Sequence, residues 1–176
     1  ENPPQSVVEL LQALVRIPSV NPDGDPGTPH TGEEACARYI AAFLEHSGAE
    51  TFLDEVEPGR PNVIGHYPTS TTGKPRILFA PHTDTVSVGG MTIEPFGGEI
   101  RDGKIWGRGA SDTKGSAAAM LWALHACKDA LLAALDALPD AVKADFESFR
   151  EAMGMLLPML RAKWLRVVGE GPGRAV

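Results

Sequence analysis

Cysteine is scarce in this sequence, with only Cys36 and Cys127 among 176 residues. The two lie far apart and in different predicted helices, and no C-x-x-C spacing occurs. This pattern supports neither a zinc-finger site nor a disulfide framework. Because free cysteine is among the most buried residue types, we expect both thiols to be reduced and buried.

An excess of positive charge is also lacking, as are long apolar runs. The formal net charge is −7 at pH 7, whereas a nucleic-acid-binding protein shows a basic face, so no nucleic-acid partner is expected. No apolar run approaches the roughly 18 to 20 residues that cross a bilayer, and no signal-peptide pattern opens the chain. We therefore expect no membrane partner and a cytoplasmic location, although the chain begins with Glu1 rather than Met.

The sequence is 43% hydrophobic, which suffices for one core in a chain of this length. Apolar spacing predicts a helix over residues 6–17, with Ser6 as N-cap and Glu9 completing a capping box. A second helix is expected from Thr31 as N-cap to about residue 48. Three strands, a hairpin and a long helix follow, over residues 50–56, 62–67, 75–80, 99–106 and 115–138. This order predicts an α/β fold, a sheet with flanking helices, and a helical C-terminal segment.

Residues 78–114 hold the polar side chains that suggest chemistry. The predicted strand 75–80 runs directly into His82 and Asp84, and residues two apart on an extended chain share a face. A metal-bound imidazole is commonly oriented by a carboxylate on its second nitrogen. Asp112 lies in a glycine-rich turn before the long helix, and ligands of α/β sheets collect at strand ends. His82 and Asp112 are thus candidate metal ligands, with Asp84 behind His82.

A phosphate-binding loop is another interpretation of the same glycines. A Walker-type loop ends in Gly-Lys-Ser/Thr, but here the order is Lys114-Gly115-Ser116. A dinucleotide fingerprint requires glycine at the position that Asp112 occupies. Both mismatches disfavour nucleotide binding.

Four short sequence motifs occur in this order: PHTDTV at residues 81–86, EPF at 94–96, DGKIWGRGA at 102–110 and DTKG at 112–115. Together they resemble the di-zinc amidohydrolase and peptidase family that includes acetylornithine deacetylase, succinyl-diaminopimelate desuccinylase, aminoacylase and carboxypeptidase G. The resemblance covers roughly residues 5 to 125. We accordingly predict the N-terminal part of a zinc-peptidase-like catalytic domain over residues 1–125, and a helical tail over residues 126–176 whose residues 162–168 fit a final strand.

The resemblance implies a zinc-dependent metallopeptidase-type hydrolase of amide bonds in N-acyl amino acids or small peptides, either a deacylase or a carboxypeptidase. It implies two zinc ions in a complete site, with cobalt or manganese as substitutes. By this resemblance Asp112 bridges the two metals, His82 binds one of them, and Asp84 orients His82. The implied partners are a small N-acyl amino acid or peptide substrate and a second copy in a homodimer.

The tail departs from the family pattern. In the family, a strand after the long helix ends in two adjacent glutamates, a general base and a metal ligand, but no Glu-Glu pair follows Asp112 here. Glu170 follows an apolar stretch and is the nearest candidate for the catalytic residue; the alternative is a solvated turn. Two functions therefore stay open, a hydrolase with an incomplete site, or a catalytically inactive fragment or variant that binds a partner or self-associates through its helical tail (139–160).

Overall fold

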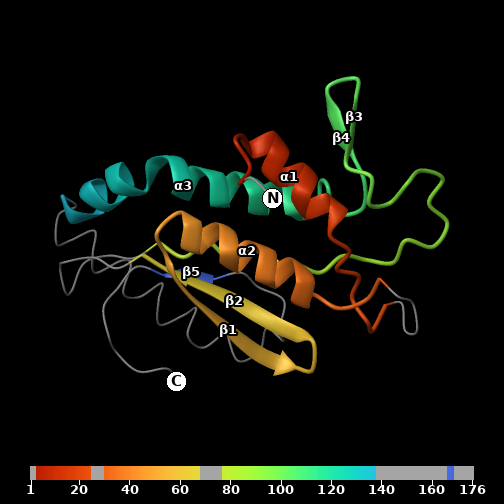
Figure 1. The fold of residues 1–176 in the computed structure, drawn as a ribbon, viewed down its shortest axis with the longest axis horizontal. Helices are drawn as coiled ribbons and strands as arrows, with labels where there is room; N and C mark the ends of the chain where they lie inside the picture. Colours follow the sequence, from red (N-terminus) through yellow and green to blue (C-terminus); the bar gives the residue numbers. More distant parts are fainter. Residues whose placement is uncertain (1–2, 25–29, 68–76, 138–165, 169–176) are drawn as a thin grey trace.

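The computed structural model describes residues 3–24, 30–67, 77–137 and 166–168, without the side chains of residues 135, 136 and 166–168. The elements in chain order are α1 (Val7–Arg16), α2 (Glu34–His46), β1 (Glu50–Glu57), β2 (Arg60–His66), β3 (Glu99–Arg101), β4 (Lys104–Trp106), α3 (Lys114–Asp136) and β5 (Arg166–Val168). Helix α2 packs against β1 and β2, and α1 packs against α3 (Figure 1). The predicted α/β fold with helices flanking a sheet is confirmed.

Helix α1 begins as its sequence predicts. The Ser6 hydroxyl accepts a hydrogen bond from the Glu9 amide at 3.2 Å. The Glu9 carboxylate reaches back to the Gln5 amide at 2.7 Å, one residue before the position that a capping box would use. Leu10 and Leu14 are fully buried on the inner face of the helix. The capped first turn fixes the start of α1, and its inner face packs in the core.

Helix α2 differs from its prediction at the N-terminus. Its N-cap is Glu33 rather than Thr31, and no side chain caps the helix. The reason is that the Glu33 carboxylate is buried and turned toward Arg60 of β2. At the other end Gly48 adopts φ +93°, so it ends the helix as expected.

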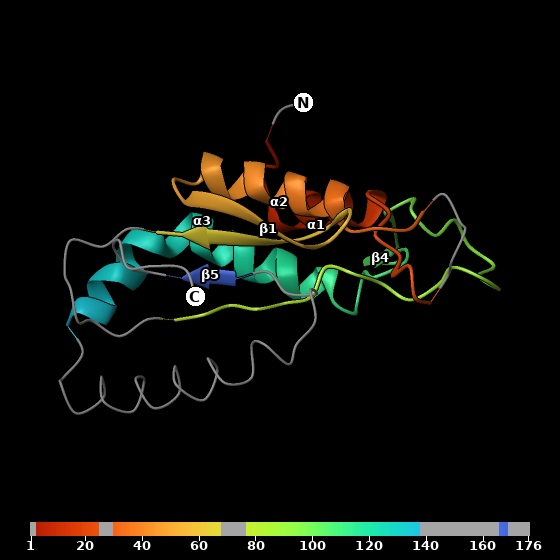
Figure 2. The same ribbon diagram turned by 90° about the horizontal axis from the view of Figure 1, so that it is seen from below.

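The three-stranded sheet has the order β1-β2-β5, with β1 antiparallel and β5 parallel to β2. Strands β1 and β2 match the first two predicted strands, and β5 lies within the predicted final strand. Residues 77–80 of the predicted third strand belong to no strand of the described sheets and are half-buried. A segment from the far end of the chain pairs with β2, which local patterns cannot predict. Figure 2 shows residues 77–84 as an extended segment that leads toward the β3–β4 side of the molecule.

Helix α3 supplies the other side of the core, where four of its residues are buried with side chains of α1, α2 and β2: Ala117, Ala118, Leu121 and Leu124. Phe43 of α2 and Trp122 of α3 both contact the ring of His125, with centroid distances of 5.6 and 5.3 Å. Cys36 is buried as predicted, but Cys127 on α3 is exposed, because α3 turns that face to solvent. The remaining predicted tail, residues 138–165 and 169–176, lies outside the described residues.

The length and composition of α3 correct one expectation from the sequence. Its segment Lys114–Ala134 is long and apolar enough to cross a membrane by those criteria alone. The sequence shows no long continuous apolar run because the run at residues 117–124 ends at His125, and Lys128 and Asp129 follow. Core helices of soluble proteins pass the same test, and one face of α3 packs in the core described above.

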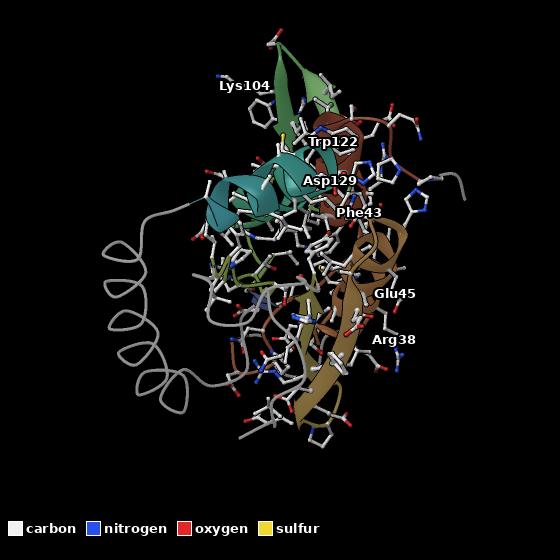
Figure 3. The ribbon with its side chains drawn as sticks, turned by 90° about the vertical axis from the view of Figure 1, so that its left-hand side faces the viewer. Arg38, Phe43, Glu45, Lys104, Trp122 and Asp129 are labelled. Atoms are coloured by element: carbon white, nitrogen blue, oxygen red, sulfur yellow. The ribbon has the colours of Figure 1, made fainter. Side chains whose placement is uncertain are left out.

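The predicted hairpin is confirmed as β3 and β4, joined by Asp102 and Gly103. Both turn residues have positive φ, 53° and 71°, as a two-residue hairpin turn requires. The hairpin projects away from the helices (Figure 3) and leads directly into the glycine-rich loop before α3.

Candidate metal centre

The imidazole of His82 has a carboxylate at each of its ring nitrogens. Nδ1 lies 3.1 Å from Oδ1 of Asp84, and Nε2 lies 3.1 Å from Oδ1 of Asp112. The backbone carbonyl oxygen of Asp84 is also 3.0 Å from Nδ1. The structure thus brings together the three residues that the sequence singles out, from positions 30 residues apart in the chain.

Asp84 is fixed from behind by the loop that follows α1. Its Oδ2 accepts a hydrogen bond from Nδ2 of Asn21 at 2.9 Å. The two segments are also joined through the backbone, because Thr85 N donates to Ser19 O and Asn21 N donates to Thr85 O. The Ser19 hydroxyl adds a 2.7 Å bond to the Thr83 carbonyl oxygen. Asp84 is only 8% exposed, so it holds His82 from the buried side of the cleft that both residues line.

Asp112 reaches His82 because the loop before α3 turns tightly. Gly109 adopts φ +81° and is buried, and a Cβ atom there would lie 2.8 Å from Cγ2 of Thr85. Only glycine therefore allows the loop to pass this close to the segment that carries His82. The Lys114 amide closes the turn by donating to the Gly109 carbonyl oxygen at 3.0 Å. The Asp112 side chain is 86% exposed, in contrast to buried Asp84, and faces the open side of the site.

Lys114 anchors this loop to α1. Its side chain is buried, and Nζ donates to the carbonyl oxygens of Leu14 and Ile17 at 3.0 and 2.6 Å. These carbonyls lie at the C-terminal end of α1, where the helix dipole favours a positive charge. Burial of the ammonium lowers the pKa of Lys114. The sequence places Lys114 in the DTKG motif that resembles the family, but it gives no indication of this structural role.

A cleft of about 250 Å³ lies over these residues. His82, Thr85 and Val86 line one side and residues 107–112 line the other. The two exposed ligand atoms, His82 Nε2 and Asp112 Oδ1, are 3.1 Å apart. Two atoms that bind one tetrahedral zinc at roughly 2.0–2.2 Å lie about 3.3–3.5 Å from each other. The donor types therefore fit part of a zinc site, and the two atoms need to move apart by only a few tenths of an ångström to bind one zinc ion.

The rest of a metal site is not found in the part of the chain that the structure describes. Among those residues no group of three or more histidine, cysteine, aspartate or glutamate side chains is placed to hold a metal ion. Glu170, the sequence candidate for the catalytic residue, lies outside the described residues. A catalytic zinc ordinarily has three protein ligands, so these residues supply only part of the ligand set.

A buried ion pair near the site escapes sequence reasoning entirely. Arg60 of β2 binds Glu33 at the start of α2, with Nε 3.0 Å from Oε2 and Nη2 2.9 Å from Oε1. Glu33 is 1% and Arg60 7% exposed. Glu33 raises the pKa of Arg60 above its ordinary value. The partners lie 27 residues apart, and neither position shows a local signal for the pairing.

Comparison with known proteins identifies the same stretch of chain. The sequence profile described as Peptidase family M20/M25/M40 matches residues 78–143. A succinyl-diaminopimelate desuccinylase of Beijerinckia indica subsp. indica is 38% identical over 119 residues, which are 65% of this chain and 29% of the relative. A second one, from Methylorubrum extorquens, is 38% identical over 128 residues, 70% of this chain and 31% of the relative.

A solved structure, an M20 family metallo-carboxypeptidase, Sso-CP2, from Sulfolobus solfataricus, superposes with a TM-score of 0.54 and 18% sequence identity. The superposition covers 96% of this chain and 31% of that protein, and it supports the fold alone. The chain thus spans less than a third of the length of each relative named here. The resemblance found in the sequence is confirmed: residues 78–143 match the Peptidase family M20/M25/M40 profile, and the partial coverage fits the N-terminal part of the catalytic domain.

Proposed function

We propose that this chain carries the His82 and Asp112 side of a divalent-metal site in a hydrolase of amide bonds, of the deacylase or carboxypeptidase type. The observation that carries the proposal is the convergence of His82 Nε2 and Asp112 Oδ1 at the cleft, 3.1 Å apart, with Asp84 on the opposite nitrogen of His82. Zinc is the first candidate metal, because imidazole and carboxylate are both common zinc ligands.

Each residue has a distinct task in this proposal. His82 would bind the metal through Nε2, and the exposed carboxylate of Asp112 would bind beside it and bridge to a second ion. Asp84 would accept a hydrogen bond from Nδ1–H, which would leave the Nε2 lone pair to bind the metal. When bound, the metal supplies a water of lowered pKa and polarises the substrate carbonyl. The glycine-rich loop, residues 107–112, lines the same cleft.

The substrate class follows from the relatives. Those named above are succinyl-diaminopimelate desuccinylases, so the first compounds to assay are N-succinyl-diaminopimelate and other N-acyl amino acids, followed by small peptides with a free C-terminus. The remaining ligands and the general base, for which Glu170 is the candidate in this sequence, must complete the site before the chain turns over any substrate.

Metal binding can be tested before activity. The wild-type chain should bind zinc in a chelator competition, and either His82→Ala or Asp112→Ala should remove that binding. His66→Ala is the matched control, because His66 lies on β2 and pairs with Glu50 at 3.5 Å instead of facing the cleft. The same titration with cobalt and manganese distinguishes the metals. A wild-type chain that binds none of the three and hydrolyses none of the substrates would refute this function and favour the inactive self-association module.

A further inference from the structure

The Arg60–Glu33 ion pair has one contact that a purely structural pair does not need. Nη2 of Arg60, which binds Glu33, also donates to Oδ1 of Asn21 at 3.3 Å. Nη1 carries the remaining acidic partners of the guanidinium, Glu57 at 2.9 Å and Asp23 at 3.6 Å. The guanidinium therefore links the start of α2 to the loop behind the candidate metal centre.

The contact with Arg60 decides how the Asn21 carboxamide is oriented. Its Oδ1 accepts from Arg60 and also from the Asp23 amide at 3.0 Å. With the oxygen turned to these two donors, Nδ2 faces the other way and donates to Oδ2 of Asp84 at 2.9 Å. A carboxamide rotated by half a turn would place its oxygen against the Asp84 carboxylate and its NH2 group against Arg60. Both of those contacts would be repulsive.

The orientation of the Asn21 carboxamide also affects His82, because both residues contact the Asp84 carboxylate. Because Nδ2 of Asn21 occupies Oδ2 of Asp84, Oδ1 of that carboxylate is the oxygen presented to Nδ1 of His82 at 3.1 Å. When a metal lies between Nε2 and Asp112, the acceptor at Nδ1 keeps the ring proton on Nδ1 and fixes the ring orientation, so that Nε2 can bind the metal. A continuous series of polar contacts thus runs from Glu33 through Arg60, Asn21 and Asp84 to His82.

We propose that Asn21, held by the Arg60–Glu33 ion pair, is a positioning residue that orients Asp84 and through it the metal-binding imidazole of His82. The proposal rests on the proposed function for the role of His82, and it adds three residues outside the cleft to the machinery of the site: Asn21, Arg60 and Glu33. It also explains why the guanidinium lies in the interior: its fork binds the Glu33 carboxylate and the Asn21 oxygen in one rigid geometry, which a lysine cannot reproduce.

The test compares Asn21→Ala with Glu57→Gln. The first removes the amide between Arg60 and Asp84, whereas the second alters a partner on Nη1 of the same guanidinium and leaves the contact with Asn21 in place. Asn21→Ala should weaken zinc binding about 10-fold, at the low end of the 10–100-fold range for groups behind a metal ligand. Glu57→Gln should bind zinc as the wild type does. Asn21→Leu, which keeps the branched shape of the side chain without its polar atoms, should match Asn21→Ala, provided that circular dichroism shows the same folded state.

A second readout needs no metal. In protein labelled with ¹⁵N at histidine, the ring nitrogens of His82, assigned through His82→Ala, should shift in Asn21→Ala and stay in place in Glu57→Gln. If the wild-type chain binds no zinc but the His82 signals still respond to Asn21, the positioning role stands and the proposed function falls. Unchanged His82 signals in Asn21→Ala, or zinc affinity within twofold of the wild type, would overturn the positioning role.

Discussion

Replacing Lys114 by methionine tests how the Asp112 loop is attached to the rest of the fold. Methionine has similar length and packs well in a core, so the substitution removes the ammonium with little change in volume. The Leu14 carbonyl keeps a backbone donor, the Ile17 amide at 3.3 Å, but the Ile17 carbonyl loses its 2.6 Å bond from Nζ. The variant therefore removes two things at the C-terminal end of α1: the hydrogen-bond donor of the Ile17 carbonyl and one positive charge.

The expected cost can be worked out from these contacts. A buried carbonyl left without a donor costs about 1–3 kcal/mol, and loss of a cation at a helix C-terminus costs about 0.3–1 kcal/mol, or up to ~2 in a partly buried site. Relief of the ammonium desolvation offsets part of this. We expect the free energy of unfolding of Lys114→Met to fall by about 1–3 kcal/mol.

Urea unfolding followed by circular dichroism measures this difference, with an unchanged m-value as the check that both proteins unfold in the same way. Lys128→Met is the matched control, because Lys128 lies on the same helix with only an exposed contact to its neighbour Asp129. That variant should stay within about 0.5 kcal/mol of the wild type. Equal stability of the two variants would refute the anchoring role of Lys114.

Two further predictions concern the glycine loop and the thiols. Gly109→Ala should destabilise the protein more than Gly103→Ala, because both glycines have positive φ but an added Cβ meets Thr85 only at Gly109 and meets nothing within 4 Å at Gly103; equal losses in urea unfolding would show that the close approach to Thr85 is unimportant. A thiol reagent should label exposed Cys127 in the native protein and buried Cys36 only after unfolding. Burial raises the pKa of Cys36, so above about pH 8.5 the unfolded chain loses this proton before the folded one does and stability falls with pH. Cys36→Ala should reduce that slope, and an identical slope would contradict the assignment.

The local parts of this fold could be predicted from the sequence. The N-terminus of α1 and the β3–β4 turn depend on residues within a few positions of each other, namely Ser6 with Glu9 and Asp102 with Gly103. The approach of His82 to Asp84 follows from their spacing of two residues. In each case the physical cause lies inside one short segment, so pattern and structure agree.

The long-range parts could not be predicted in this way. Thr31 looks like an N-cap, but α2 starts at Glu34 because the buried carboxylate of Glu33 binds Arg60, 27 positions away. Lys114 bonds to the Ile17 carbonyl across 97 positions. The neighbour of β2 comes from residues 166–168 rather than from the predicted third strand. These contacts depend on the assembled fold, and single-segment patterns carry no information about them.

The central claim is that His82 and Asp112 bind one metal ion, and anomalous X-ray diffraction from zinc-soaked crystals tests it directly. The account predicts a zinc peak over the cleft, within roughly 2.0–2.2 Å of both His82 Nε2 and Asp112 Oδ1. A peak bound elsewhere, or a cleft in which these two atoms keep their 3.1 Å contact with no metal between them, would contradict it.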